Sequence, residues 1–117
     1  MRFEVQEQAE ARGVRVVAIR GDLDVDTCAE LRRRLEPRDG APPAVIDLTD
    51  CGFIDSTGIA LLVSAARRAG RDGTAGIVVV ATPGGQVRRA LRLTNVDSTL
   101  PVLGSLDAAL GTLTESP

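Results

Sequence analysis

A carboxylate and two hydroxyls stand next to one another in residues 55–59, whose sequence is Asp-Ser-Thr-Gly-Ile. The apolar run at 45–48 contains β-branched residues and predicts a buried strand. Beyond residue 58, apolar side chains recur at the i, i+3, i+4 and i+7 spacing of one helix face: Ile59, Leu62, Val63 and Ala66. Asp55 and Ser56 are therefore predicted at a helix N-terminus, where a short side chain that carries oxygen caps free N–H groups. Such a serine is a helix cap, part of an anion site, or a hydroxyl offered to another molecule.

The residues that most often perform nucleophilic or metal chemistry are absent from the chain. There is no His, and all 14 basic residues are Arg, which excludes Ser–His, Cys–His and Ser–Lys pairs and imidazole metal sites. Cys28 and Cys51 lack metal-type spacing and are predicted core residues. The aspartates of residues 21–26 do not form a calcium loop, because Thr27 and Arg33 occupy its sixth and twelfth positions. We therefore expect a protein that is not an enzyme and needs no catalytic residue, metal or cofactor.

Length and composition indicate one globular domain. The 117 residues are 44% apolar and 26% charged, and Phe3 and Phe53 are the only aromatic residues. The scarcity of aromatic rings and the net charge of −2 argue against direct binding of nucleic acid. No apolar run approaches the ~20 residues of a membrane span, and the first residues do not form a signal peptide. We therefore expect a cytoplasmic protein that does not insert into a membrane.

Periodicity and turn residues predict the order β-β-α-β-α-β-α-β-α. Strands are expected at 2–8, 14–19, 45–48, 76–81 and 100–103. Residues 21–26 are predicted as an acidic loop, Thr27 and Glu30 as a capping box, and Thr82 with Pro83 as the start of a later helix. Ser105 is expected to cap the last helix. This order predicts an α/β fold: a mixed, mainly parallel sheet of about five strands, with about four helices packed against it. We expect a single domain over 1–117 with a frayed tail at 114–117.

Two motifs in this order of elements resemble those of the STAS domain family, and within it a stand-alone anti-sigma factor antagonist. The motifs are the Gly-Asp-Leu-Asp turn at 21–24 and the Asp-Ser-Thr-Gly-Ile segment at 55–59. The resemblance covers about residues 14–110. It implies that Ser56 is a phosphoacceptor for a partner anti-sigma factor, which is an ATP-dependent serine kinase and holds the ATP itself. It also implies the residues that contact this partner: Asp24, Asp55, Thr57, Gly58 and Ile59. Many relatives have a second Ser at the place of Thr57, whose hydroxyl is a second candidate for modification.

The resemblance and the physics of a helix N-terminus lead to one functional hypothesis. Unphosphorylated, the protein would bind the anti-sigma factor and so release a sigma factor; phosphorylated at Ser56, it would let go. A serine phosphatase would reverse the change, and we expect a monomer or weak dimer. A phosphate adds about −1.5 to −2 charges, which the helix N-terminus attracts and Asp55 repels. Three alternatives remain: a STAS subunit of a lipid-transport ATPase complex, a small-molecule sensor that binds a nucleotide, and a scaffold in which Ser56 only caps a helix.

Overall fold

The computed structural model describes residues 3–9, 13–35, 43–71 and 76–114, and the following account is limited to them. Six strands are present: β1 (Glu4–Ala9), β2 (Arg15–Leu23), β3 (Ala44–Asp47), β4 (Cys51–Ile54), β5 (Ile77–Val80) and β6 (Val102–Leu103). Four α-helices accompany them: α1 (Cys28–Arg34), α2 (Ser56–Arg71), α3 (Gln86–Leu93) and α4 (Leu106–Thr114). A single 3₁₀ turn, Val96–Ser98, follows α3.

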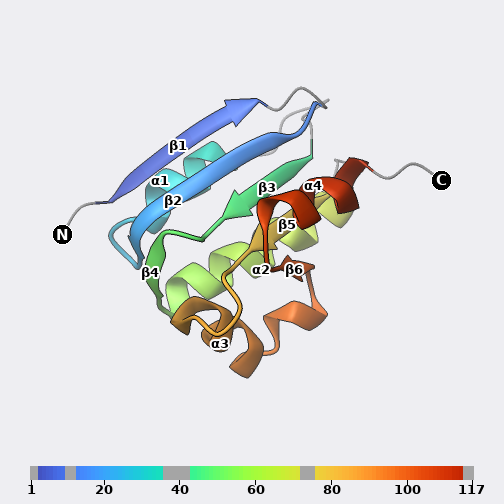
Figure 1. Ribbon diagram of the computed structural model, residues 1–117. Helices are drawn as coiled ribbons and strands as arrows, with labels where there is room; N and C mark the ends of the chain where they lie inside the picture. Colours follow the sequence, from blue (N-terminus) through green and yellow to red (C-terminus); the bar gives the residue numbers. More distant parts are fainter. Residues whose placement is uncertain (1–2, 10–12, 36–42, 72–75, 115–117) are drawn as a thin grey trace.

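The strands form one mixed sheet in the order β1-β2-β3-β5-β6. β1 and β2 pair in antiparallel, and the pairs β2–β3, β3–β5 and β5–β6 are parallel. Helices α1, α2 and α3 cover one face, and α4 lies on the other (Figure 1). The predicted α/β class, with a mainly parallel sheet and four helices, is confirmed.

Each face of the sheet has its own apolar core. The larger core joins inward residues of β2, β3 and β5, such as Val17, Ile46 and Val79, to α1, α2 and α3. The smaller core joins Val16, Val45 and their neighbours to α4. Both faces of the central strands are therefore buried, as expected for parallel strands that helices cover.

The structure adds a strand that the sequence analysis did not predict. Residues 21–23, expected to begin an acidic loop, continue β2, and β4 pairs with them in parallel: Leu23 lies opposite Ile54. The register shifts between Gly21 and Asp22, and Gly21 has a φ of 104°, a conformation that favours glycine. This bulge lets β2 pair with β3 along its first part and with β4 along its last part.

One predicted helix start is wrong, and one predicted capping box is absent. Thr82 does not cap α3, because residues 82–85 form a turn in which the Gly85 N–H donates to the Thr82 carbonyl at 3.0 Å. Pro83 at the second position and Gly84, with a φ of 81°, at the third are the residues that a type II turn favours. Helix α3 therefore begins only at Gln86, with Gly85 as its N-cap. Helix α1 begins after Thr27, as predicted, but the capping box is absent, since the Thr27 side chain makes no cap hydrogen bond to α1.

Other predictions at the helices fare better. Ser105 caps α4 as predicted, because its Oγ accepts the Ala108 N–H at 3.2 Å. Thr114, expected in the tail, is the last residue of α4, whereas the rest of that tail lies outside the described residues. The buried face of α2 is rotated from the predicted one. Its most buried side chains are Leu61, Leu62 and Ala65, and Val63 is only partly covered.

Candidate functional site

The N-terminus of α2 is held by Asp55, which lies between β4 and the helix. Its backbone N–H donates to the Leu23 carbonyl at 3.2 Å, so the end of β4 is tied to the end of β2. Its Oδ1 accepts the Gly58 N–H at 3.0 Å, and its carbonyl accepts the Ile59 N–H at 3.0 Å. Asp55 is therefore the side chain that caps α2.

Ser56 is the first residue of α2, and its side chain is exposed. Among the described residues its hydroxyl has no hydrogen-bond partner, since Asp55 already performs the capping. Of the three uses of a serine at this place, Asp55 already fills that of the helix cap, which leaves an anion site or a hydroxyl offered to another molecule.

Gly58 has an internal role that the sequence analysis did not predict. A Cβ at this position would lie 2.8 Å from Ile54 Cγ1 and 2.9 Å from the Leu23 carbonyl oxygen, both closer than van der Waals contact. Glycine therefore lets the first turn of α2 press directly against β2 and β4. The expected role of Gly58 as an approach point for a partner remains a prediction, and Gly58 itself is buried.

A tight turn at residues 24–27 places Asp24 beside this helix end. The Thr27 hydroxyl donates to the Asp22 carbonyl at 2.7 Å and accepts the Asp24 N–H at 2.9 Å. Asp24 Oδ1 in turn accepts the N–H groups of Asp26 at 3.0 Å and Thr27 at 3.2 Å. Thr27 therefore fastens the turn rather than capping α1.

Asp24 and Asp55 both follow strand ends that are tied together, because the Asp55 N–H donates to the carbonyl of Leu23, the residue before Asp24. Burial raises the pKa of Cys28, and the negative charges of Asp55 and Asp24 raise it further. The two acids that raise this pKa are 31 positions apart in the sequence, and the charge of Arg32 lowers it. Burial also raises the pKa of Cys51, and both cysteines are buried and free, as predicted for core residues.

The remaining predicted site residues lie on the first turn of α2 and are less accessible than Ser56. Thr57 is half-buried, and Ile59 packs against the larger core.

Sequence reasoning missed two exposed apolar residues near the site. Val25, in the turn, is 66% exposed, and Phe53, on β4, is 49% exposed. Neither was marked by its own segment, because Val25 lies in a predicted loop and the four residues of β4 give no strand pattern alone.

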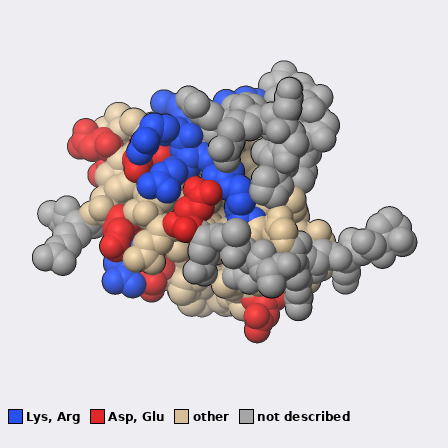
Figure 2. Space-filling view, turned by 90° about the horizontal axis from the view of Figure 1, so that it is seen from above, with Lys and Arg blue, Asp and Glu red and all other residues tan. Residues whose placement is uncertain are grey.

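A group of arginines near β1 is engaged in ion pairs within the chain. Arg15 contacts Glu7 at 2.8 Å, and Arg34 contacts Glu7 at 3.7 Å and Glu30 at 3.4 Å; Arg33 also contacts Glu30. Figure 2 shows basic and acidic side chains interleaved on the side of the molecule where β1 lies. This network joins β1, β2 and α1, and its carboxylates neutralise much of its positive charge.

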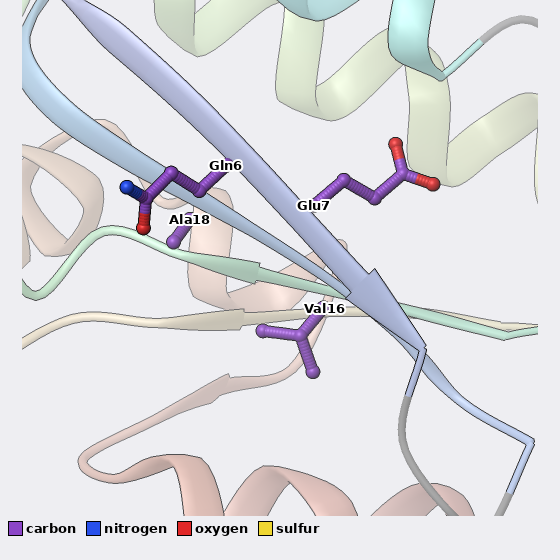
Figure 3. A pocket seen from close by; sticks show the side chains of 4 residues that line it. All are labelled: Gln6, Glu7, Val16 and Ala18. Atoms are coloured by element: carbon purple, nitrogen blue, oxygen red, sulfur yellow. The ribbon is translucent and has the colours of Figure 1, made fainter.

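One hollow formed by described residues is too small to hold a small-molecule ligand. A hollow of about 70 Å³ lies between β1 and β2, where Gln6, Val16 and Ala18 point to one side and Glu7 to the other (Figure 3). Pockets for small molecules usually measure about 300–1,000 Å³, so this hollow is too small for a nucleotide. Within the same residues no cluster of three acids or cysteines could hold a metal ion, and no helix could cross a membrane.

Comparison with known proteins gives a consistent picture. Residues 6–106 match the family model described as "Mlab, STAS domain". The anti-sigma-F factor antagonist RsfB of Mycobacterium tuberculosis is 30% identical over 104 residues, which are 87% of this chain and 83% of that protein.

Solved structures share the fold. The crystal structure of an anti-sigma factor antagonist from Mycobacterium paratuberculosis superposes with a TM-score of 0.85 at 29% identity, over 97% of this chain and 96% of that one. The Bacillus cell fate determinant SpoIIAA, in its phosphorylated form, superposes with a TM-score of 0.66 at 16% identity, over 93% and 98% of the two chains. The chain therefore belongs to the STAS domain family and is similar over most of its length to anti-sigma factor antagonists.

Proposed function

We propose that this protein is an anti-sigma factor antagonist that works by partner switching in the cytoplasm. In the unphosphorylated form it binds an anti-sigma factor with serine kinase activity, and the sigma factor is released. The kinase transfers the γ-phosphoryl group of its own ATP to the Ser56 hydroxyl, the proton of that hydroxyl is lost, and ADP remains on the kinase. The phosphorylated protein then dissociates, and a serine phosphatase restores it by hydrolysis.

The observation that carries the proposal is the exposed Ser56 hydroxyl at the start of α2. Asp55 satisfies the helix end, so a partner can take the hydroxyl without removing the cap. Only the Oδ1 atoms of Asp24 and Asp55 accept hydrogen bonds from described residues. Their Oδ2 atoms are therefore available to orient the hydroxyl, or the magnesium and nucleotide that the kinase brings.

The same carboxylates explain why a phosphate would act as a switch. A phosphate on Ser56 adds about −1.5 to −2 charges beside Asp55, with Asp24 close by. A partner surface matched to a neutral hydroxyl would lose roughly 2–5 kcal/mol against a buried charge without a partner, or about 30-fold to several thousand-fold in affinity. This change needs no refolding of the protein.

The relatives support the proposal at a coarser level. The mycobacterial proteins are named as antagonists of anti-sigma factors, and SpoIIAA has been solved in unphosphorylated and phosphorylated forms. Carried to this chain, these names favour a regulator that is the substrate of a kinase and not an enzyme itself.

The test is intact mass after incubation with Mg-ATP and each purified anti-sigma factor kinase of the source cell. We expect a mass gain of one phosphate in the wild type and in Ser64→Ala, which removes an exposed serine from the same helix. Ser56→Ala should show no gain, and Thr57→Ala reports whether the second hydroxyl is used. No gain with any kinase would contradict the proposal and leave Ser56 in a scaffold.

Binding supplies the second half of the test. The kinase should bind the wild type at least 30-fold more tightly than Ser56→Asp, which places a fixed charge at the site. Equal affinities would contradict the switch. Stable co-purification with a transport ATPase, whatever the state of Ser56, would instead favour the lipid-transport subunit.

A further inference from the structure

The carboxylates of Asp24 and Asp55 are held in the same way, each by one of its two oxygens. Asp24 Oδ1 accepts the N–H groups of Asp26 at 3.0 Å and Thr27 at 3.2 Å. Asp55 Oδ1 accepts the Gly58 N–H at 3.0 Å. Among the described residues, the Oδ2 atom of each carboxylate accepts no hydrogen bond. Each acid is therefore fixed at one oxygen and open to an outside donor at the other.

The backbone brings these two acids to one end of the molecule. Leu23 and Ile54 lie opposite one another in the parallel pair of β2 and β4, and the next residues are Asp24 and Asp55. The Asp55 N–H also donates to the Leu23 carbonyl at 3.2 Å. Asp24 therefore leaves its strand next to the residue that precedes Ser56, and a movement of the turn at 24–27 would carry its carboxylate away from that place.

The turn is held by hydrogen bonds and not by packing. None of the four side chains at 24–27 is buried, and the Val25 side chain is 66% exposed. The Thr27 hydroxyl donates to the Asp22 carbonyl at 2.7 Å and accepts the Asp24 N–H at 2.9 Å. Its oxygen also lies 3.1 Å from Asp24 Oδ1. One hydroxyl therefore ties the backbone on both sides of Leu23, and the N–H of the same residue holds the Asp24 carboxylate.

We propose that Thr27 is a positioning residue for the phosphorylation of Ser56, an inference that rests on the proposed function. Thr27 acts through Asp24: its hydroxyl fixes the turn so that Asp24 Oδ2 already stands where the kinase meets it. A group that is ordered before binding spares the complex the cost of ordering it. Loss of the hydroxyl would leave the Asp24 side chain in the protein but no longer in its place.

Three variants and one matched control test this role. Thr27→Val keeps the shape of the side chain without the hydroxyl, and Thr27→Ser keeps the hydroxyl. Asp24→Asn keeps an oxygen for the N–H groups of the turn and removes the charge. Ser105→Ala is the control, because it removes a hydroxyl that accepts the Ala108 N–H at the start of α4, on the other face of the sheet (Figure 1). Circular dichroism and thermal melting show that each variant is folded at the assay temperature.

The measurement is kcat/KM for phosphorylation by the purified kinase that modifies Ser56 in the mass experiment. We expect Asp24→Asn to lower it by about 30-fold, because hydrogen bonds to charged groups are the stronger ones. Thr27→Val should lower it by about 10-fold, since the carboxylate is present but no longer fixed. Thr27→Ser and Ser105→Ala should stay within about threefold of the wild type.

The double variant Thr27→Val/Asp24→Asn shows whether Thr27 acts through Asp24. If it does, the double variant should react about 30-fold more slowly than the wild type, as Asp24→Asn alone does. Independent effects would instead multiply to about 300-fold. A purely structural role of Thr27 would not make its effect depend on the charge at position 24.

The outcomes separate this inference from the proposed function. If Ser56 is phosphorylated in the wild type and Thr27→Val reacts within twofold of it, the hydroxyl only stabilises the fold, and the proposed function stands. The inference is also wrong if the double variant loses about 300-fold, if Asp24→Asn reacts like the wild type, or if Ser105→Ala loses as much as Thr27→Val. If no kinase modifies Ser56, the proposed function and the inference both fail.

Discussion

Two neighbouring strands end together in this molecule, and each passes into a helix in a different way. Leu23 at the end of β2 lies opposite Ile54 at the end of β4. β2 continues through the turn at 24–27 into α1, whereas β4 reaches α2 through a single residue, Asp55. Both junctions carry a hydroxyl next to the helix start, on Thr27 and on Ser56.

The difference lies in what holds each hydroxyl. The Thr27 hydroxyl is used within its turn, bound to the Asp22 carbonyl and the Asp24 N–H, and α1 receives no side-chain cap. At α2 the carboxylate of Asp55 takes the capping role, and the hydroxyl beside it is exposed. A serine at a helix start is therefore available to a partner when its neighbour performs the capping.

The largest expected effect on stability concerns the close packing between α2 and the ends of β2 and β4. Gly58→Ala should destabilise the fold by about 2 kcal/mol, because its Cβ would lie 2.9 Å from the Leu23 carbonyl oxygen, which cannot move freely. Gly111→Ala, in the interior of α4 with nothing within 4 Å of the new Cβ, should stabilise by about 0.5–1 kcal/mol. Urea unfolding of both variants measures the difference. If both substitutions change the free energy of unfolding in the same direction, helix propensity, and not the contact with β2, determines the effect at Gly58.

The next largest effect on stability concerns the turn at residues 24–27, which connects β2 to α1. Thr27→Val should cost about 1–2 kcal/mol, since it leaves the Asp24 N–H and the Asp22 carbonyl without their partner in the turn. Thr27→Ser keeps the hydroxyl and should retain most of the stability. Unfolding in urea checks both, and a Thr27→Val variant as stable as the wild type would mean that water replaces the hydroxyl.

The Asp55 cap of α2 should contribute less to stability than the Thr27 hydroxyl does. Asp55→Ala should lose about 1 kcal/mol, the usual value of a side-chain cap, whereas Asp55→Asn keeps an oxygen for the Gly58 N–H. Ser56→Ala should change stability by less than about 0.5 kcal/mol, as exposed substitutions usually do. If Ser56→Ala instead destabilises the fold as much as Asp55→Ala, the serine shares the capping, and its hydroxyl is not free for a partner.

Where the sequence analysis was right, the signal was local. Asp55 and Ser56 follow a strand and precede a helical repeat, and the cap that this order predicts is present. The predicted caps of two other helices differ in the same respect: the cap of α4 is present, and the side-chain cap of α1 is absent. Ser105 has its predicted partner within its own helix, whereas the hydroxyl of Thr27 finds acceptors in the preceding turn. Glu30, expected to reach back to Thr27, lies instead against Arg33 and Arg34.

Where the analysis failed, the cause was distant in the sequence. Residues 21–23 include a glycine and an aspartate, and they form a strand only because β4 pairs with them. β4 itself has four residues, one of them Gly52, which gives no strand pattern that could be recognised alone. The internal role of Gly58 depends on the position of Leu23, 35 positions earlier in the chain. No periodicity within the helix could have shown it.

The smallest expected effect on stability concerns the ion pairs that hold α1, which α2 lacks among the described residues. Both helices pack apolar side chains into the larger core, but α1 is also joined to β1 and β2 by ion pairs. The hydrogen bond from Arg15 holds the pKa of Glu7 below its ordinary value of 4.5. Because the folded pKa is the lower one, the stabilisation is present above about pH 4.5 and is lost as the pH falls through the folded pKa.

Urea unfolding of wild type and Glu7→Gln at a series of pH values measures this contribution. We expect a difference below about 1 kcal/mol at pH 7, because the pair is partly exposed and salt weakens it. The difference should shrink toward zero as the solution is acidified below the pKa of Glu7. Glu4→Gln, at an exposed position of the same strand, is the control and should show little difference at any pH. A Glu7→Gln difference that persists in acid would mean that side-chain packing, and not charge, joins α1 to the edge of the sheet.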